Sequence, residues 1–73
     1  MKKDELERLR NDFPAGTRIE LVEMDDVHAP PKGTMGTIDG VDDSGNLLVS
    51  WDNGSRLNAI WGVDKVKKIE NTL

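Results

Sequence analysis

The sequence contains no cysteine, one histidine and only three aromatic residues among its 73 positions. Without cysteine the chain can form no disulfide, no thiolate zinc site and no cysteine nucleophile, a composition that suits a reducing cytosol. No apolar run approaches the roughly 18 residues of a membrane span, and Met1 is followed by charged residues rather than by an apolar signal-peptide core. We therefore expect a cytoplasmic domain that does not bind a membrane.

The length of the chain predicts one small domain with no room for a second. A domain of this size buries only about 60% of the surface of its unfolded chain, so a large enclosed active-site cavity is not expected. Hydrophobic residues (36%) and charged residues (33%) occur in proportions that suit a folded globule better than a disordered tail.

The charges are unevenly distributed along the chain, although the net charge is only −4. Residues 13–55 carry two basic and eight acidic side chains, whereas residues 56–73 carry four basic and two acidic side chains. Nucleic-acid binding depends on clustered cations, so the acidic middle of the chain disfavours a general nucleic-acid-binding function. The basic C-terminal part leaves that function open as an alternative.

The first segment is predicted to be a short helix, because residues 2–12 are almost all good helix formers. Leu6, Leu9 and Phe13 are three and four residues apart and lie on one side of such a helix. Pro14 ends the helix, since the residue before a proline is displaced from the α region. We expect residues 1–13 to form an N-terminal helical segment that covers one end of the following domain.

After this segment the pattern changes to short strands separated by turns. The predicted strands span residues 17–24, 33–41, 47–52, 55–60 and 65–69. The apolar positions change faces at Leu21 and Val22, which predicts a bend or bulge there. Asn53-Gly54 predicts a two-residue hairpin turn of type I′. Five short strands at this spacing are typical of a small all-β barrel.

The inward faces of the strands predict the core and distinguish the two tryptophans. Trp51 alternates with Leu47 and Val49 and should be buried, whereas Trp61 precedes a glycine in a connection and should keep part of its ring accessible. The remaining predicted core residues are Ile19, Leu21, Ile38, Val41, Leu57, Val66 and Ile69.

Several motifs of the strand-forming region resemble those of a known bacterial family. They are Gly-Thr-Met-Gly-Thr-Ile at 33–38, Asp-Asp-x-Gly at 42–45, Val-x-Trp-Asp-Asn-Gly at 49–54 and Gly-Val-Asp at 62–64. Over Phe13 to Ile69 the chain resembles the family of domain of unknown function 4314. The resemblance implies an SH3-like barrel, members found in mobile-element contexts, and no established activity. The expected fold is therefore mainly β: a small five-stranded SH3-like barrel over residues 14–70, after a short N-terminal α-helix.

Residues that could support catalysis are present, but their spacing does not pair them. His28 lies in a proline-flanked loop, and no serine is placed to act with it. Asp25-Asp26 and Asp42-Asp43 could act as acid and base, yet both pairs occupy positions where turns favour aspartate for its backbone hydrogen bonds. The run 42–46 also lacks the alternating acids of a calcium loop. We therefore expect no enzymatic activity, no cofactor and no metal site.

The longest loop and the second tryptophan suggest a binding groove. In SH3-like barrels, the groove beside the first long loop carries aromatic and acidic residues and receives extended or proline-rich peptides. Here the loop offers Asp25, Asp26 and His28, and Trp61 follows the fourth predicted strand. A tryptophan near carboxylates can hold a Lys or Arg side chain. We predict a small interaction module that binds a protein or peptide beside residues 25–32, unless Trp61 only covers the barrel end or packs on the helix.

Two other functions stay open at this point. A nucleic-acid-binding accessory protein of a mobile element would use a basic patch, with Trp61 stacking on a base. The candidate residues of that patch are Lys32, Arg56, Lys65, Lys67 and Lys68. A structural adaptor or a homo-oligomer would instead expose an apolar patch. An acidic groove would favour the peptide-binding function, whereas a continuous basic stripe would favour nucleic acid.

Overall fold

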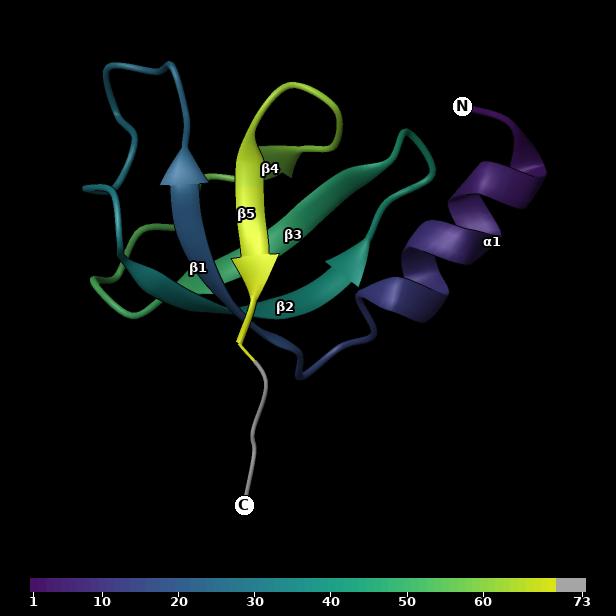
Figure 1. Ribbon diagram of the computed structural model, residues 1–73, viewed down its shortest axis with the longest axis horizontal. Helices are drawn as coiled ribbons and strands as arrows, with labels where there is room; N and C mark the ends of the chain where they lie inside the picture. Colours follow the sequence, from purple (N-terminus) through teal and green to yellow (C-terminus); the bar gives the residue numbers. More distant parts are fainter. Residues whose placement is uncertain (70–73) are drawn as a thin grey trace.

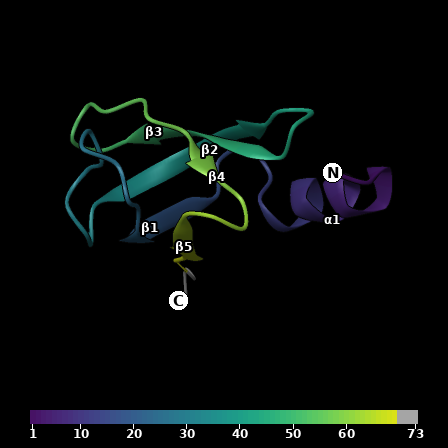
Figure 2. The same cartoon turned by 90° about the horizontal axis from the view of Figure 1, so that it is seen from above.

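The computed structural model describes residues 1–69 and contains one helix and five strands in that range. In chain order they are α1 (Lys3–Asp12), β1 (Arg18–Glu23), β2 (Met35–Val41), β3 (Asn46–Trp51), β4 (Ala59–Ile60) and β5 (Lys65–Lys68). All five strands belong to one antiparallel sheet with the order β4-β3-β2-β1-β5. The helix lies beside the turn that joins β2 to β3 (Figures 1 and 2).

The mainly β prediction, with five strands after a short helix, is confirmed. The sheet is strongly curved, so that β3 and β5 lie on opposite sides of its interior (Figure 2). Within residues 1–69 the edge strands β4 and β5 are not paired with each other, so the hydrogen-bonded sheet is open. Closure into an SH3-like barrel stays a prediction, and the predicted domain end at residue 70 lies outside the described residues.

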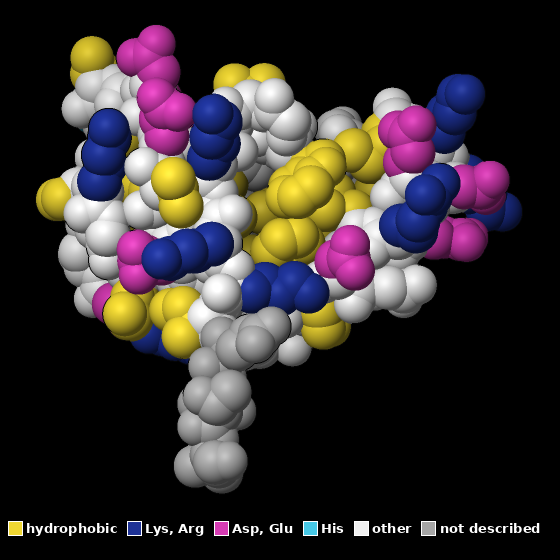
Figure 3. Space-filling model, viewed as in Figure 1, with side chains coloured by type: hydrophobic (Ala, Val, Ile, Leu, Met, Phe, Trp, Pro, Cys, Tyr) yellow, Lys and Arg dark blue, Asp and Glu magenta, His cyan; other side chains and the backbone are white. Residues whose placement is uncertain are grey.

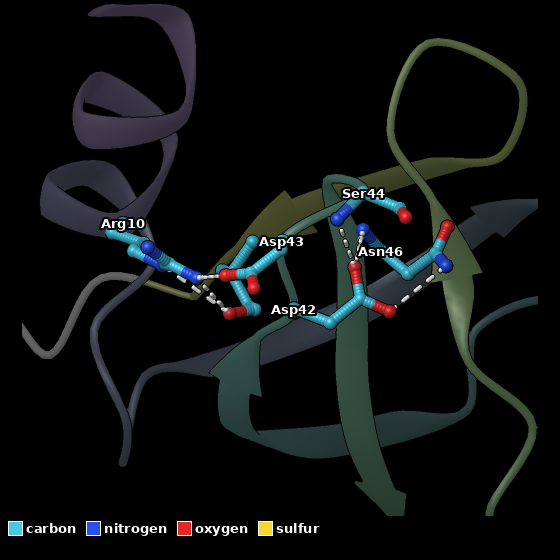
Figure 4. Close-up of polar contacts among 6 residues, drawn as sticks. Arg10, Asp42, Asp43, Ser44 and Asn46 are labelled. Atoms are coloured by element: carbon cyan, nitrogen blue, oxygen red, sulfur yellow. Dashed lines mark hydrogen bonds and ion pairs between the residues drawn. The ribbon is translucent and has the colours of Figure 1, made fainter. Parts of the chain in front are cut away.

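The helix is fixed to the sheet by two apolar side chains and one arginine. Leu9 and Phe13 are buried in the core, on the side of the helix that their spacing predicts. The N–H of Phe13 donates to the carbonyl of Leu9 at the end of the helix, directly before Pro14. The guanidinium of Arg10 donates to the carbonyl of Val41 at 3.1 Å and to Asp43 at 2.9 Å (Figure 4). The N-terminal segment therefore packs against the same core as the strands.

The core agrees with the predicted inward faces, with two exceptions. Its buried side chains are Leu9, Phe13, Ile19, Leu21, Ile38, Leu47, Val49, Trp51 and Ala59. Val41 and Val66 are partly buried and pack against this cluster, and Ile69 is also partly buried. The predictions for Leu57 and Ile69 are wrong, because both side chains are only partly buried, do not belong to this cluster and line surface grooves instead.

The change of faces in the first strand is confirmed as a β-bulge. The pairing of β1 with β5 shifts register between Leu21 and Glu23, where one residue is added on the β1 side. Leu21 therefore points into the core with 1% of its surface exposed, whereas Val22 is 41% exposed. The other predicted strands begin and end within two residues of the observed ones, except the fourth.

The fourth predicted strand and the turn before it need correction. Only Ala59–Ile60 of the predicted strand 55–60 pairs with β3, because the carbonyl of Leu57 accepts a 2.8 Å hydrogen bond from the indole N–H of Trp51. The type I′ turn is wrong as well, since it needs positive φ at both central residues and Gly54 alone has it, at 91°. The N–H of Gly54 donates to the carbonyl of Trp51, which makes a three-residue loop.

Two aspartates near strand ends are held by polar contacts. The carboxylate of Asp42 accepts hydrogen bonds from the backbone of Asn46 at 2.8 Å and of Ser44 at 3.0 Å (Figure 4). The Asn46 backbone bond is the main reason why the pKa of Asp42 lies below its ordinary value. Arg18 donates to both oxygens of Asp52, at 2.8 and 2.6 Å, and lowers the pKa of that carboxyl in the same way.

Candidate functional site

A groove with an apolar floor and acidic sides lies between the start of the β1–β2 loop and the β4–β5 turn. It has a volume of about 370 Å³, and we call it the acidic groove. Its apolar lining consists of Met24, Leu57, Ile60 and Val63. Its polar lining consists of Asp25, Asp26, Asn46, Asn58 and Asp64. The groove is concave and combines apolar contact area with a few charged groups, as ligand sites on proteins commonly do.

The turn between β4 and β5 forms one wall of the acidic groove. The carbonyl of Ile60 accepts the N–H groups of Val63 at 3.0 Å and Asp64 at 2.8 Å, and Gly62 has the positive φ, 88°, that completes the turn. The carboxylate of Asp64 in return accepts the N–H of Ile60 at 2.8 Å. This local network holds the side chains of Ile60 and Val63 at the surface, where they are 48% and 71% exposed.

The start of the β1–β2 loop forms the opposite wall. Met24 packs partly against the core and anchors the loop directly after β1. Asp26 shapes the next turn, because its carboxylate accepts the N–H of His28 at 2.7 Å and its carbonyl accepts the N–H of Ala29 at 3.0 Å. Asp25 lies between these two fixed positions and is exposed.

The three carboxylates of the acidic groove have no cationic partner among residues 1–69. Five ion pairs join lysine or arginine to carboxylates in that range, and none includes Asp25, Asp26 or Asp64. No lysine or arginine lines the groove either. The groove therefore carries uncompensated negative charge next to exposed apolar surface.

Only part of the predicted groove is brought together by the fold. Asp25 and Asp26 line the acidic groove, whereas His28 is exposed in the same loop and does not. Trp61 does not line it either, because this side chain points towards the helix and packs on Phe13, with ring centroids 5.3 Å apart. The sequence-based groove of Asp25, Asp26, His28 and Trp61 is thus replaced by one with Ile60, Val63 and Asp64 in place of the histidine and the tryptophan.

Trp61 forms part of a second hollow, between α1 and the β4–β5 turn. The hollow has a volume of about 320 Å³, and hydrophobic side chains gather between the helix and the strands in Figure 3. Trp61 is 45% exposed and Trp51 is 3% exposed, so the predicted difference between the two tryptophans is confirmed. The packing of Trp61 on Phe13 agrees with the alternative in which Trp61 covers the helical end of the sheet.

The last strand carries lysines that are neutralised across the sheet. Lys65 approaches Glu23 at 3.5 Å and Lys67 approaches Glu20 at 3.6 Å, each opposite its partner in the pairing of β1 with β5. Cross-strand pairs of opposite charge stabilise a sheet and reduce the positive potential above it. These two lysines share one face of β5, as their alternation predicts.

The other cations of the predicted basic patch point elsewhere. Arg56 lies 4.0 Å from Asp39, and the ammonium of Lys68 lies 5.3 Å from the centroid of the Phe13 ring. Lys32 is exposed in the β1–β2 loop. The five candidate residues therefore occupy β5 and two separate connections, and three of them lie next to carboxylates.

One comparison with known proteins gives a result. The family model for a domain of unknown function (DUF4314) matches residues 2–69. The chain belongs to this family. The match includes the helix, so the DUF4314 region is longer than the resemblance over Phe13 to Ile69 indicates. No curated protein and no solved structure matches the chain.

In the described part of this DUF4314 member we also looked for clusters of metal-ligating side chains and for membrane-spanning helices. Residues 1–69 contain no group of three or more His, Cys, Asp or Glu side chains that could hold a metal ion. The single helix of that range is too short and too polar to cross a membrane. Sequence reasoning missed seven residues of the groove: Met24, Asn46, Leu57, Asn58, Ile60, Val63 and Asp64. The clue for Ile60 and Val63 was the presence of apolar residues on both sides of Gly62 in a turn.

Proposed function

We propose that this protein is a small interaction module that binds a segment of another protein in the acidic groove. The observation that carries the proposal is the exposure of Ile60 and Val63 in a concave site next to uncompensated carboxylates. Apolar side chains grouped at a concave surface are typical of sites where proteins bind a partner. The function is binding without catalysis, because the groove offers carboxylates and amides but no nucleophile paired with a base.

The position of the acidic groove supports the same function. It lies beside the connection 24–34, which is the longest between two strands of the sheet. SH3-like barrels bind extended peptides beside their first long loop. We interpret the open, curved sheet as a barrel of this kind, in which the groove has the corresponding place.

Selection of binding peptides tests the proposal. A phage-displayed library of random peptides is selected on the full 73-residue protein, and the affinity of the selected peptides is then measured by fluorescence anisotropy. We expect the double variant Ile60→Gln/Val63→Gln to bind at least about tenfold more weakly, which corresponds to a loss of about 1.4 kcal/mol. Both side chains are exposed, so circular dichroism should show an unchanged fold.

A second double variant provides the control. Val22 and Met35 are exposed by 41% and 42%, so they resemble Ile60 in exposure, but they do not line the acidic groove. Val22→Gln/Met35→Gln should therefore leave peptide affinity within about twofold of the native value, a change of less than 0.5 kcal/mol on the scale of about 1.4 kcal/mol per tenfold. Equal losses in both double variants, or no loss in either, would show that the selected peptides bind outside the groove.

Nucleic-acid binding has less support from the contacts of the candidate residues. Lys65, Lys67 and Arg56 each lie within 4.0 Å of a carboxylate, and neutralised cations release fewer counterions on binding a phosphate backbone. A gel-shift assay with a single-stranded oligonucleotide compares the two functions directly. Binding that depends on salt and is lost in Lys65→Gln/Lys67→Gln would favour nucleic acid over the peptide partner.

A further inference from the structure

We infer that the acidic groove selects a basic segment, in which one aliphatic residue is flanked by Lys or Arg, and that it holds this segment by its side chains rather than as an added β-strand. The inference rests on the proposed function, because it specifies the partner of the same groove. Three observations carry it: the charge of the groove, its apolar lining and the edge of the sheet.

The charge of the groove specifies the flanking residues. Asp25, Asp26 and Asp64 surround the apolar floor, and no cation within residues 1–69 compensates them. Asp26 and Asp64 each use one carboxylate oxygen on a backbone N–H of their own turn. Such bonds orient both carboxylates and leave their negative charge in place. A ligand with two or three cations gains electrostatic attraction from all three carboxylates, whereas an acidic ligand is repelled.

The apolar floor specifies the central residue. Leu57, Ile60 and Val63 line the groove together with its three carboxylates. A volume of about 370 Å³ lies at the lower end of the range for small-ligand sites, about 300–1,000 Å³, so the groove suits one or two side chains of the partner. An aliphatic side chain fits this floor, and the residues before and after it then reach the carboxylates.

The edge of the sheet excludes the usual alternative, in which a peptide pairs with an edge strand. β4 is the edge beside the groove, and it consists of only two residues. The N–H and C=O of Ile60 are already bonded within the β4–β5 turn, to Asp64 and to the N–H groups of Val63 and Asp64. Strand addition requires free N–H and C=O groups along an edge, and Ile60 offers none. Recognition at the groove is therefore assigned to side chains.

Titration of synthetic peptides into the ¹⁵N-labelled full chain tests the inference. Three peptides share a Gly-Ser frame and differ in a central Lys-Leu-Lys, Glu-Leu-Glu or Ser-Leu-Ser. We expect the basic peptide to shift the amide signals of residues 24–26 and 57–64, with an affinity that falls at least about fivefold between 50 and 500 mM NaCl. The acidic peptide should leave these signals unchanged.

Two variants with the same net charge separate the groove from general electrostatics. Asp25→Asn/Asp26→Asn removes two groove charges, and asparagine at position 26 can still accept the N–H of His28. This variant should bind the basic peptide at least about fivefold more weakly, because two of three attractive charges are lost. Asp4→Asn/Glu7→Gln removes two exposed charges from α1 instead and should bind like the native protein.

A fourth peptide tests the binding mode, with an ester in place of the amide that follows the leucine. The ester lacks the N–H that strand pairing would use, so side-chain recognition predicts an affinity within about threefold of the amide, whereas strand addition predicts a loss of about tenfold or more. A loss of that size would overturn the side-chain mode. Shifts of the groove signals by the acidic or neutral peptide as strong as those by the basic one would overturn the charge selection and leave the proposed function standing. If no peptide shifts these signals, the inference fails, and the library selection decides the proposed function separately.

Discussion

A side chain at Gly36 in β2 would collide with neighbours that are buried in the core. A Cβ atom placed there would lie 2.8 Å from Cε3 of Trp51, 2.9 Å from Cγ1 of Val49 and 3.2 Å from the carbonyl oxygen of Ser50. Ordinary contacts between carbon atoms are about 3.5–4.0 Å, so the neighbours would have to retreat by about 0.7 Å. We therefore predict that Gly36→Ala destabilises the fold.

The expected magnitude follows from how firmly the neighbours are held. Trp51 and Val49 are 3% and 2% exposed, and the indole N–H of Trp51 is bonded to the carbonyl of Leu57 at 2.8 Å. Neither side chain can turn outwards, so the added methyl group strains the core as overpacking does, by about 1–3 kcal/mol. With a central value of about 2 kcal/mol, the melting temperature should fall by about 8–16 °C in a domain of this size.

Gly40 in the same strand provides a matched control. A Cβ atom at Gly40 would have no heavy atom within 4 Å, and neither Gly36 nor Gly40 has positive φ. Both alanine variants reduce the entropy of the unfolded chain equally, so the difference between them isolates the steric effect. Urea unfolding followed by tryptophan fluorescence gives both free energies. If Gly36→Ala is as stable as Gly40→Ala or more stable, the close contact between Trp51 and Gly36 does not restrict the packing of Trp51 on β2.

The remaining predictions concern the two tryptophans and acid stability. Trp51→Ala should lose about 3–5 kcal/mol, whereas Trp61→Ala should stay folded at 25 °C by circular dichroism, and similar losses in both would contradict their different burial. The pKa values of Asp42 and Asp52 are depressed in the folded state, so the stability they provide is complete above their unfolded pKa and is lost as the pH falls through the folded values. The urea concentration at the midpoint of unfolding should therefore decrease as the pH is lowered below about 4, near the ordinary pKa of aspartate. The decrease should be smaller in Asp42→Asn. An equally steep decrease in that variant would show that Asp42 does not contribute to the pH dependence of stability.

Those parts of the fold that depend on local pattern could be predicted from the sequence. The spacing of Leu9 and Phe13 gave the buried side of the helix, and the adjacent apolar residues Leu21 and Val22 gave the position of the bulge. In each case the information lies within a few residues, and only one arrangement buries the apolar side chains.

The errors in the β3–β4 connection arose where a hydrogen bond to Trp51 overrides the pattern of residue types. Leu57 and Ala59 alternate like strand residues, but the carbonyl of Leu57 accepts a hydrogen bond from the indole N–H of Trp51 and not from the backbone of β3. Asn53-Gly54 favours a two-residue turn in isolation, yet the hydrogen bond from Gly54 to Trp51 makes a longer loop. The spacing of apolar and polar residues along the sequence does not indicate hydrogen bonds of this kind.

The candidate site was only half predictable for the same reason. Asp25 and Asp26 stand out as an acidic pair at the start of a long loop, so they could be proposed from the sequence. Asp64 reaches the groove because the β4–β5 turn folds back on Ile60, and Trp61 leaves it because Phe13 supplies a closer apolar partner. Whether Trp61 or Asp64 faces the groove depends on how the N-terminal segment packs against the β4–β5 turn. The sequence of the turn alone does not specify that packing.

The two edges of the open sheet also bear on whether copies of this chain can pair through their strands. Unpaired edges invite pairing between copies of a chain and, in the extreme, growth into fibrils. At one edge the β4–β5 turn already occupies the backbone groups of Ile60, and at the other β5 has lysine at three of its four positions, Lys65, Lys67 and Lys68. Long charged side chains along an edge strand, lysine above all, disfavour the addition of a further strand there. The occupied backbone groups of Ile60 therefore disfavour strand addition by a second copy of this chain as well as by a ligand.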